Sequence, residues 1–348
     1  MQKTMKAIVK ARAELGGLEI KDVPVPEIGP NDVLVKMRKN GICGTDVHIY
    51  KWDAWAQRTI KTPMTLGHEF VGTIEAMGAN VTGFEIGQLV SGEGHVVCGK
   101  CRWCITGSQH LCRATKGIGV NRDGVFAEYA SIPATNIWIC DPSIPENVLA
   151  VQDPLGNAVH TAFSFPLIGE DVLITGAGPI GLMAVPIAKM AGARNIVVTA
   201  RRDAPLKMAM ELGATRTVNI RNEKISDVMA ELGMTEGFDV GMEMSGSPDA
   251  FAEMVDCMAN GGKIAILGIF ADDVKIDWDK IIFRMITLKG IYGREMYDTW
   301  YKMTALLQSG LIPHIEKLVT HEFHYSKVEE AFAAAMGPEA IKVVLNWD

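Results

Sequence analysis

The sequence predicts a two-domain protein of the α/β class, and three observations lead to this prediction. With 348 residues and a mass of 37.8 kDa, the chain is longer than one hydrophobic core usually organises. Up to about residue 150, short apolar stretches are broken by glycine and proline, which indicates a small, barrel-like β domain. From about residue 170, apolar strands alternate with helical patterns, which indicates a parallel sheet with crossover helices.

Each expected element follows from its own pattern. In the first part, apolar runs between turn residues predict strands at 5–11, 32–42, 70–78, 87–94 and 127–133. In the second part, buried strands are predicted at 171–178, 195–200, 216–220, 238–246 and 263–268, with helices between them at 179–193, 203–214, 225–233 and 248–262. The last segment alternates less regularly, with helices at 296–310 and 327–336 and a strand at 342–347. We expect it to return to the first domain.

The charge of the chain argues against a polyanionic partner. The 41 acidic residues outnumber the 34 basic ones, the formal net charge is −7, and the sequence contains no concentrated basic stretch. We therefore expect neither nucleic acid nor a membrane as a partner. The N-terminus offers no secretory signal, and no run of about 18 apolar residues occurs, so we expect a cytoplasmic location.

A glycine-rich turn predicts a dinucleotide-binding site. The stretch TGAGPIG places Gly176, Gly178 and Gly181 at the G-x-G-x-x-G spacing, directly after an apolar strand and at the start of a helical pattern. There, the first glycine makes the turn, the second lets the backbone approach a pyrophosphate, and the third lets the helix pack closely on the strand. The N–H groups of the helix N-terminus would bind the anion. A purely structural turn is the alternative.

The end of the next predicted strand favours NADP over NAD. An acidic residue about 20 positions after the glycine motif usually accepts hydrogen bonds from the ribose hydroxyls of NAD. In NIVVTARRDA, Ala200 takes this place, and Arg201 and Arg202 follow. Two guanidinium groups can bind a 2′-phosphate. The alternative is that the arginines form a solvated turn and that Asp203 reaches the ribose.

Four of the seven cysteines lie close together in the sequence. They are Cys98, Cys101, Cys104 and Cys112, within CGKCRWCITGSQHLC. Disulfide frameworks distribute their cysteines more widely, whereas metal sites cluster them. Four thiolates can surround one tetrahedral zinc ion and leave no position for a substrate, so we predict a structural zinc site. An iron–sulfur cluster is the alternative.

A second set of metal-binding side chains is spread over the first domain. Cys43 stands in GICGTDVHIY, His68 and Glu69 stand in LGHEFVG, and Asp153 stands in QDPLGNAVHT. Each alone could be a buried thiol, a core imidazole or a solvated carboxylate. Together, a thiolate, an imidazole and one or two carboxylates are the ligand types of a catalytic zinc site that keeps an exchangeable position. Beside a dinucleotide-binding pattern, they predict a zinc-dependent dehydrogenase.

These motifs resemble those of the zinc-containing medium-chain alcohol dehydrogenase superfamily along the whole chain. The superfamily pattern consists of GHEFVGTIEAMG, the four-cysteine lobe and GAGPIG. Longer stretches are similar to the L-threonine 3-dehydrogenase family, namely ICGTDVHIYKWDAWAQ, SGEGHVVCGKC, DPLGNAVHTA and GIYGREMYDTWYKM. The resemblance implies oxidation of the β-hydroxyl of L-threonine to L-2-amino-3-oxobutanoate, with hydride transfer to NAD(P)+.

The resemblance also implies an architecture. It implies a groES-like catalytic domain at 1–148, with a structural zinc lobe at about 93–115 and a completing segment at about 296–348. A Rossmann domain with a doubly wound parallel sheet would occupy 149–295. A homotetramer and NAD+ as the default cofactor are further implications. Ala200 and Pro205 depart from the family pattern, which has an acidic residue and an arginine at these positions. The residues themselves therefore favour NADP+, although the family default is NAD+.

Individual roles follow from the same resemblance. The residues Cys43, His68 and Glu69 match the catalytic zinc ligands, and the four clustered cysteines match the structural zinc ligands. Asp153 matches an acidic residue near the catalytic zinc that ligates it in some states or serves in proton transfer. The positions that match the family's proton relay are Thr45 and His48. The positions that match the lining of the nicotinamide cofactor are Ile180, Leu267, Gly268, Ile269, Ile291 and Tyr292.

Substrate recognition and other functions stay open at this point. His95, in SGEGHVV, is a candidate neighbour of the substrate carboxylate or hydroxyl, with a loop-holding histidine as the alternative. Arg294 is a second candidate, with a surface ion pair as the alternative. A polyol or secondary-alcohol dehydrogenase would use the same chemistry. The acidic charge argues against a nucleic-acid-binding zinc module, and the complete ligand set argues against a non-catalytic dinucleotide-binding protein.

Overall fold

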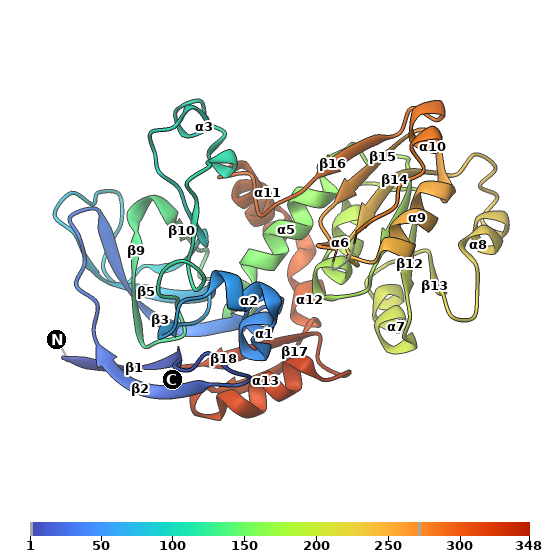
Figure 1. Ribbon diagram of the computed structural model, residues 1–348. Coiled ribbons are helices and arrows are strands. Elements are labelled where there is room, and N and C mark those ends of the chain that lie inside the picture. Colours follow the sequence, from blue (N-terminus) through green and yellow to red (C-terminus); the bar gives the residue numbers. More distant parts are fainter. Residues whose placement is uncertain (1–2, 271–272) are drawn as a thin grey trace. The chain divides into compact units, whose positions relative to one another are not determined.

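The computed structural model describes residues 3–270 and 273–348, which form two compact units (Figure 1). Unit 1 comprises the chain up to Asp153 together with Glu295–Trp300 and Ile315–Asp348. Unit 2 comprises Pro154–Arg294 and Tyr301–His314. The predicted α/β class is confirmed. No helix in the described part of the chain is both long and apolar enough to cross a membrane.

Unit 1 is built on β-sheets. The largest has the order β10-β6-β5-β3-β18-β17, with β9 also paired to β3, and a second sheet has the order β2-β1-β4. The strands of these two sheets are β1 (Thr4–Lys10), β2 (Leu18–Pro24), β3 (Asp32–Ile42), β4 (Met64–Thr65), β5 (Glu69–Met77), β6 (Leu89–Gly92), β9 (Tyr129–Pro133), β10 (Ile137–Ile139), β17 (Val319–His324) and β18 (Lys342–Asn346). The C-terminal strand β18 pairs with β3, as expected for a segment that returns to the first domain.

The core of unit 1 lies between these strands and helix α13 (Val328–Met336), which packs against β17 and β18 (Figure 1). Fully buried side chains include Val35 on β3, Phe70 on β5 and Phe332 on α13. Each buried side chain of this size contributes about 1.5–3 kcal/mol through removal from water. The core therefore anchors β3 and β5, the two strands that flank the candidate metal ligands.

Unit 2 contains a six-stranded parallel sheet of the order β13-β12-β11-β14-β15-β16. Its strands are β11 (Asp171–Thr175), β12 (Asn195–Ala200), β13 (Arg216–Asn219), β14 (Phe238–Glu243), β15 (Met258–Ile266) and β16 (Thr287–Gly290). The helices that follow the strands include α6 (Pro179–Met190), α7 (Asp203–Glu211), α8 (Ile225–Glu231), α9 (Pro248–Cys257) and α10 (Trp278–Phe283). This strand order is that of a doubly wound dinucleotide-binding sheet, whose ligand site lies where the order reverses, between β11 and β14.

The predicted helix at 248–262 is wrong in its second half. Helix α9 ends at Cys257, and β15 begins at the next residue, Met258. The register between β14 and β15 shifts after the Phe238–Met258 pair, so the segment that contains two glycines joins the sheet through an irregular start. Helix α6 continues through Pro186, although proline removes one hydrogen bond of the helix.

Candidate active site

Cys43 stands at the junction between β3 and helix α1 (Gly44–Lys51). It is the residue before the first turn of the helix, and its backbone N–H donates to Oδ2 of Asp46 at 2.9 Å. Asp46 is fully buried. An acidic side chain in the first turn of a helix satisfies an otherwise unpaired N–H group there. The local sequence Cys-Gly-Thr-Asp thus fixes the backbone from which the thiol projects.

His68 and Glu69 reach the same place from β5. Glu69 is the first residue of this strand and is paired with Gly41 of β3. A Cβ atom at Gly41 would lie 2.0 Å from Oε2 of Glu69, so only glycine leaves room for this carboxylate. One ligand atom from each of Cys43, His68 and Glu69 lies within 4.8 Å of the other two. The three side chains could therefore share one metal ion.

Two buried side chains donate hydrogen bonds to Glu69. Nζ of Lys342, on β18, lies 2.7 Å from Oε1 of Glu69 and donates to the carbonyl oxygen of Ile42 at 2.8 Å. Nδ2 of Asn40 donates to the backbone oxygen of Glu69 at 2.9 Å. Burial lowers the pKa of Lys342, but Glu69 and Cys43 outweigh this effect and raise it. Sequence reasoning missed Lys342, and its only signal is a charged residue at the start of the apolar run KVVLNW.

The electrostatics of this site fit a bound cation. Within the described ranges, Oδ1 of Asp46, Nδ1 of His68 and Oε2 of Glu69 are buried without a hydrogen-bond partner. Oδ1 of Asp46 and Nδ1 of His68 lie 3.9 Å from each other as an ion pair, which leaves Oε2 of Glu69 as the atom whose lone pairs a bound cation would accept. Burial lowers the pKa of His68, but Cys43, Asp46 and Asp153 outweigh it and raise the pKa well above its usual value. Both observations show that positive charge is favoured here, which a divalent metal ion would supply.

Of the two relay residues predicted on α1, Thr45 contacts a candidate metal ligand. Oγ1 of Thr45 is 3.9 Å from Sγ of Cys43. His48 follows three positions later and therefore lies on the same face of the helix. Asp153 is buried in α5 (Gln152–Ala162) and acts on the pKa of His68, but it is not one of the three residues whose ligand atoms lie within 4.8 Å of one another.

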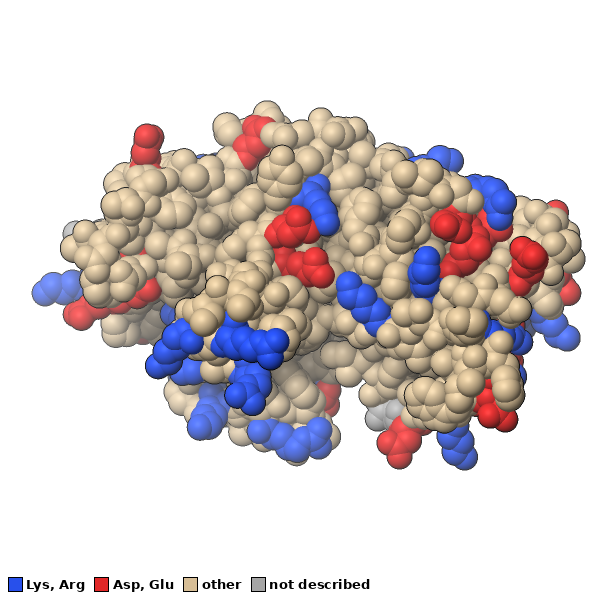
Figure 2. Space-filling view, turned by 90° about the horizontal axis from the view of Figure 1, so that it is seen from above, with Lys and Arg blue, Asp and Glu red and all other residues tan. Residues whose placement is uncertain are grey.

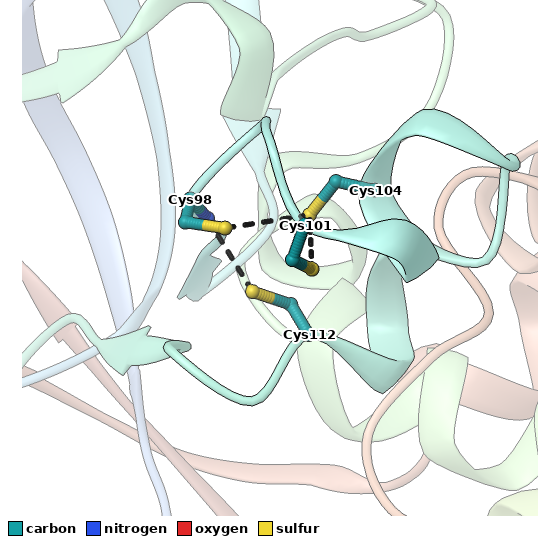
Figure 3. A group of neighbouring side chains, drawn as sticks. All are labelled: Cys98, Cys101, Cys104 and Cys112. Carbon is teal, nitrogen blue, oxygen red and sulfur yellow. Dashed lines mark hydrogen bonds between the residues drawn. The ribbon is translucent and has the colours of Figure 1, made fainter.

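The four clustered cysteines converge in the lobe between β7 (His95–Val96) and β8 (Lys116–Gly117), as Figure 3 shows. Sγ of Cys104 lies 3.5 Å from Sγ of Cys101 and 4.0 Å from Sγ of Cys98. Four sulfur atoms about 2.3 Å from a tetrahedral zinc ion would lie roughly 3.8 Å apart. None of the four forms a disulfide. The spacing of the thiols therefore fits one zinc ion.

The thiols of this lobe are not equally acidic. A hydrogen bond from the backbone N–H of Cys98 is the main cause that lowers the pKa of Cys112 to about 6. Burial raises the pKa of Cys104 to about 12. A metal ion deprotonates a coordinating thiol outright, so its charge would convert all four side chains to thiolates.

The glycine turn of unit 2 has the geometry that its spacing predicts. Gly176 follows β11 with φ of +93°, which a residue with a side chain rarely adopts. Gly178 precedes the first turn of α6. A Cβ atom at Gly181 would lie 1.9 Å from the carbonyl oxygen of Gly176, so glycine is required for the close approach of helix and strand. The turn thus presents the N-terminus of α6 at the carboxyl end of the sheet.

The other predicted cofactor residues follow the carboxyl ends of the neighbouring strands. In the register of the sheet, Thr175 pairs with Thr199 and Glu243, and Ile266 pairs with Glu243 and Gly290. The carboxyl ends of all these strands therefore lie at the same end of the sheet. The predicted residues at or just after these ends are Ala200, Arg201, Arg202, Leu267, Gly268, Ile269, Ile291 and Tyr292. Ile180 is half-buried in the first turn of α6.

The two substrate candidates differ in their surroundings. Nδ1 of His95 lies 2.9 Å from Oε1 of Glu93, a buried carboxylate that also accepts from the backbone N–H of His95 at 3.0 Å. This is the arrangement of a histidine that holds a loop, and its contact with a substrate stays a prediction. Arg294 is buried and donates to Oδ1 of Asn157 at 3.2 Å. Its interpretation as a surface ion pair is therefore wrong.

Comparison with known proteins agrees with this fold. Residues 29–142 match the family model described as "Alcohol dehydrogenase GroES-like domain", and residues 179–309 match "Zinc-binding dehydrogenase". A solved zinc-binding dehydrogenase from Sinorhizobium meliloti 1021, bound to NADP, has a TM-score of 0.89 and 29% identity over 99% of this chain and 100% of its own. An alcohol dehydrogenase from Escherichia coli CFT073, complexed with NADH, has a TM-score of 0.90 and 28% identity with the same coverage. The predicted groES-like and Rossmann folds are confirmed, and the class is that of the zinc-dependent medium-chain dehydrogenases.

Relatives with higher sequence identity show the family within this class. The L-threonine 3-dehydrogenase of Solibacter usitatus (strain Ellin6076) is 56% identical over 344 residues, which are 99% of this chain and 100% of that protein. The L-threonine 3-dehydrogenase of Escherichia coli (strain K12) is 55% identical with the same coverage. The chain belongs to the L-threonine 3-dehydrogenase family.

Proposed function

We propose that the protein oxidises the β-hydroxyl of L-threonine to L-2-amino-3-oxobutanoate and transfers the hydride to a nicotinamide cofactor. The observation that carries this proposal is the convergence of Cys43, His68 and Glu69, whose ligand atoms lie within 4.8 Å of one another while Oε2 of Glu69 is buried without a hydrogen-bond partner. The family membership supports the substrate, because the relatives named above are L-threonine 3-dehydrogenases. The glycine turn of unit 2 supports the cofactor.

Each residue of the site has a separate role in the proposed reaction. A zinc ion held by Cys43, His68 and Glu69 would act as a Lewis acid that lowers the pKa of the substrate hydroxyl, and the nicotinamide would accept the hydride. Lys342 binds Oε1 of Glu69, which leaves the other carboxylate oxygen, Oε2, without a hydrogen-bond partner and available to a metal ion. Asp46 holds the backbone of Cys43 in place.

The proton of the substrate hydroxyl must leave the site. Thr45 stands beside Cys43, and its hydroxyl can both accept and donate a hydrogen bond. His48 lies further along the same helix face, and 61% of its side chain is exposed to solvent. An imidazole changes its charge near neutral pH, so His48 can take up the proton and release it to water.

A spectrophotometric assay of nicotinamide reduction tests the proposed function. Wild-type protein is compared on L-threonine, sorbitol and simple secondary alcohols, with each cofactor and with a chelator-treated control. We expect the highest kcat/KM with L-threonine and no activity after chelation. A higher kcat/KM with sorbitol would favour the polyol dehydrogenase function instead.

The four-cysteine lobe is proposed to bind structural zinc, and replacement of one ligand is expected to affect stability rather than chemistry. Cys104→Ser should remove one zinc ion per chain and lower the midpoint of thermal unfolding, because the remaining thiols hold the metal less tightly. Metal analysis and calorimetry check this. An iron signal in place of zinc, or an unchanged zinc content, would contradict the assignment.

We propose NADP+ as the preferred cofactor. Ala200 ends β12 without a carboxylate, and Arg201 and Arg202 are exposed beside it. Asp203 accepts a hydrogen bond from Nδ2 of Asn219 at 2.6 Å, which engages the acid that would otherwise serve the ribose of NAD. Replacement of both arginines by alanine should raise KM for NADP+ at least about tenfold and leave KM for NAD+ nearly unchanged. A wild-type preference for NAD+ would overturn the proposal.

We propose that the protein forms a homotetramer, as its resemblance to the family implies. In support, β16 is an edge strand of the unit 2 sheet, and large apolar side chains near it are exposed, with Phe283 at 79% and Met285 at 80%. Exposed apolar patches of this kind mark protein–protein contacts. On the face drawn in Figure 2, basic side chains gather at the lower left of the view, and acidic and basic side chains lie close together toward the centre and right. Light scattering should report four times the chain mass, and a monomer would contradict the proposal.

A further inference from the structure

Asp53 connects the proposed proton relay to the next helix. One carboxylate oxygen, Oδ1, accepts hydrogen bonds from the backbone N–H groups of Trp55 and Ala56, at 3.0 Å each, and so caps α2 (Ala54–Thr59). The other oxygen, Oδ2, is hydrogen-bonded to Nδ1 of His48. A single carboxylate therefore serves two different elements at once.

The turn between the two helices places this carboxylate. Helix α1 ends at Lys51, and the next residue, Trp52, adopts the left-handed conformation with φ of 54° and donates its N–H to the carbonyl oxygen of Ile49 at 3.2 Å. Nε2 of Gln57 donates to the carbonyl oxygen of Trp52 at 2.8 Å. The ring of Trp55 meets the ring of His48 edge-on, with 6.2 Å between the centroids. His48 is thus held on two sides, although most of its side chain is exposed.

We propose that Asp53 is a positioning residue of the proton relay, because its carboxylate fixes the tautomer of His48; the inference rests on the relay role proposed above. A carboxylate only accepts hydrogen bonds, so Nδ1 of His48 carries the hydrogen and Nε2 keeps a lone pair. When Nε2 takes up the proton from the relay, an imidazolium forms, and the negative charge of Asp53 stabilises it. The imidazolium then releases one proton to water and returns to its neutral form.

The ionisation of Asp53 supports this role. Hydrogen bonds from the backbone of Ala56 and from His48 hold the pKa of Asp53 below its usual value, although burial opposes them. The side chain is therefore a carboxylate near neutral pH. The same logic operates where an acidic residue orients a catalytic histidine, and loss of the acid there gives the wrong tautomer.

The substitution Asp53→Asn separates the two tasks of this side chain. Asparagine caps helices about as well as aspartate, so the cap of α2 and the midpoint of thermal unfolding should be kept. Its Nδ2 group would donate to Nδ1 of His48 and reverse the tautomer. We expect kcat to fall about tenfold, while KM for L-threonine changes less than about twofold. Asp53→Ala should also lower the unfolding midpoint, because it loses the cap.

A matched control and a double variant complete the test. Asp277 caps α10 through one hydrogen bond from the backbone N–H of Lys280 at 3.4 Å, and among the described residues no histidine is bonded to it, so Asp277→Asn should keep the wild-type kcat. In a His48→Asn background, Asp53→Asn should cause no further loss, because its effect passes through His48. An unchanged kcat in Asp53→Asn would overturn the inference. So would a further fall in kcat when Asp53→Asn is added to His48→Asn, of the same size as in the wild-type background.

The outcomes also separate this inference from the proposed function. If the wild-type protein does not oxidise L-threonine, the proposed substrate is wrong, and the variants are compared on the secondary alcohol that it does oxidise. If His48→Asn alone keeps the wild-type kcat, both the relay and the role of Asp53 are wrong. If only His48→Asn lowers kcat, the relay stands and the role of Asp53 is wrong.

Discussion

Replacement of Cys43 by alanine is expected to lower kcat/KM for L-threonine by about three orders of magnitude. The thiolate is the only sulfur ligand of the proposed catalytic site, and an imidazole and a carboxylate alone hold zinc weakly. A Lewis acid supplies several kcal/mol to the transition state, and each ~1.4 kcal/mol is a factor of ten in rate. Steady-state kinetics should show the loss, and metal analysis should show that one of two zinc ions per chain is missing.

Cys257 provides the matched control for this prediction. It is a half-buried free thiol at the end of α9 and belongs to unit 2, whereas the candidate ligands belong to unit 1. Cys257→Ala should therefore keep both zinc ions and the wild-type rate. The prediction fails if Cys43→Ala keeps the zinc content of the wild type, or if its kcat/KM is no lower than that of Cys257→Ala.

Replacement of Lys342 by methionine is expected to destabilise the protein by about 3–5 kcal/mol. Both partners of the Lys342–Glu69 pair are buried, with side-chain exposures of 3% and 0%, so the substitution leaves a buried carboxylate without its cation. For a unit of this size, 1 kcal/mol corresponds to about 2–4 °C, so the midpoint of thermal unfolding should fall by about 6–20 °C. The fall should be larger after chelation, because bound zinc would still compensate part of the charge of Glu69.

Lys327 serves as the control for this second prediction. Its ammonium lies 3.5 Å from Glu330, and the side chains are 58% and 62% exposed. Exposed pairs contribute about 0–1 kcal/mol, so Lys327→Met should hardly change the midpoint. Calorimetry of both variants, with and without a chelator, decides the matter. Equal midpoints for Lys342→Met and Lys327→Met would show that the buried pair does not support the site.

Metal-binding side chains could be predicted from the sequence because their chemistry is visible in the residue types. The cysteines of the lobe are close in sequence, so their convergence needs only a local loop. Cys43 and the His68–Glu69 pair converge because β3 and β5 are neighbouring strands, which the family resemblance implied but spacing alone did not show. The glycine turn could be predicted for the same reason as the lobe.

The groups that support the ligands could not be predicted in this way. Lys342 stands 273 positions from Glu69 and meets it only because β18 pairs with β3. Asp53 looks like an ordinary helix cap, and only the left-handed turn at Trp52 brings it to His48. Arg294 is of a residue type that is usually exposed, yet it is buried and donates a hydrogen bond to Asn157, which lies 137 positions away in the sequence. Contacts that depend on tertiary packing leave no local pattern in the sequence.

The most direct test of the shared metal site is anomalous X-ray diffraction from crystals of the zinc-loaded protein, measured on both sides of the zinc absorption edge. Two peaks per chain are expected, one among the four lobe cysteines and one in contact with Cys43, His68 and Glu69. A peak at the lobe with none between Cys43 and His68 in zinc-saturated crystals would contradict the assignment of a catalytic zinc ion to this chain.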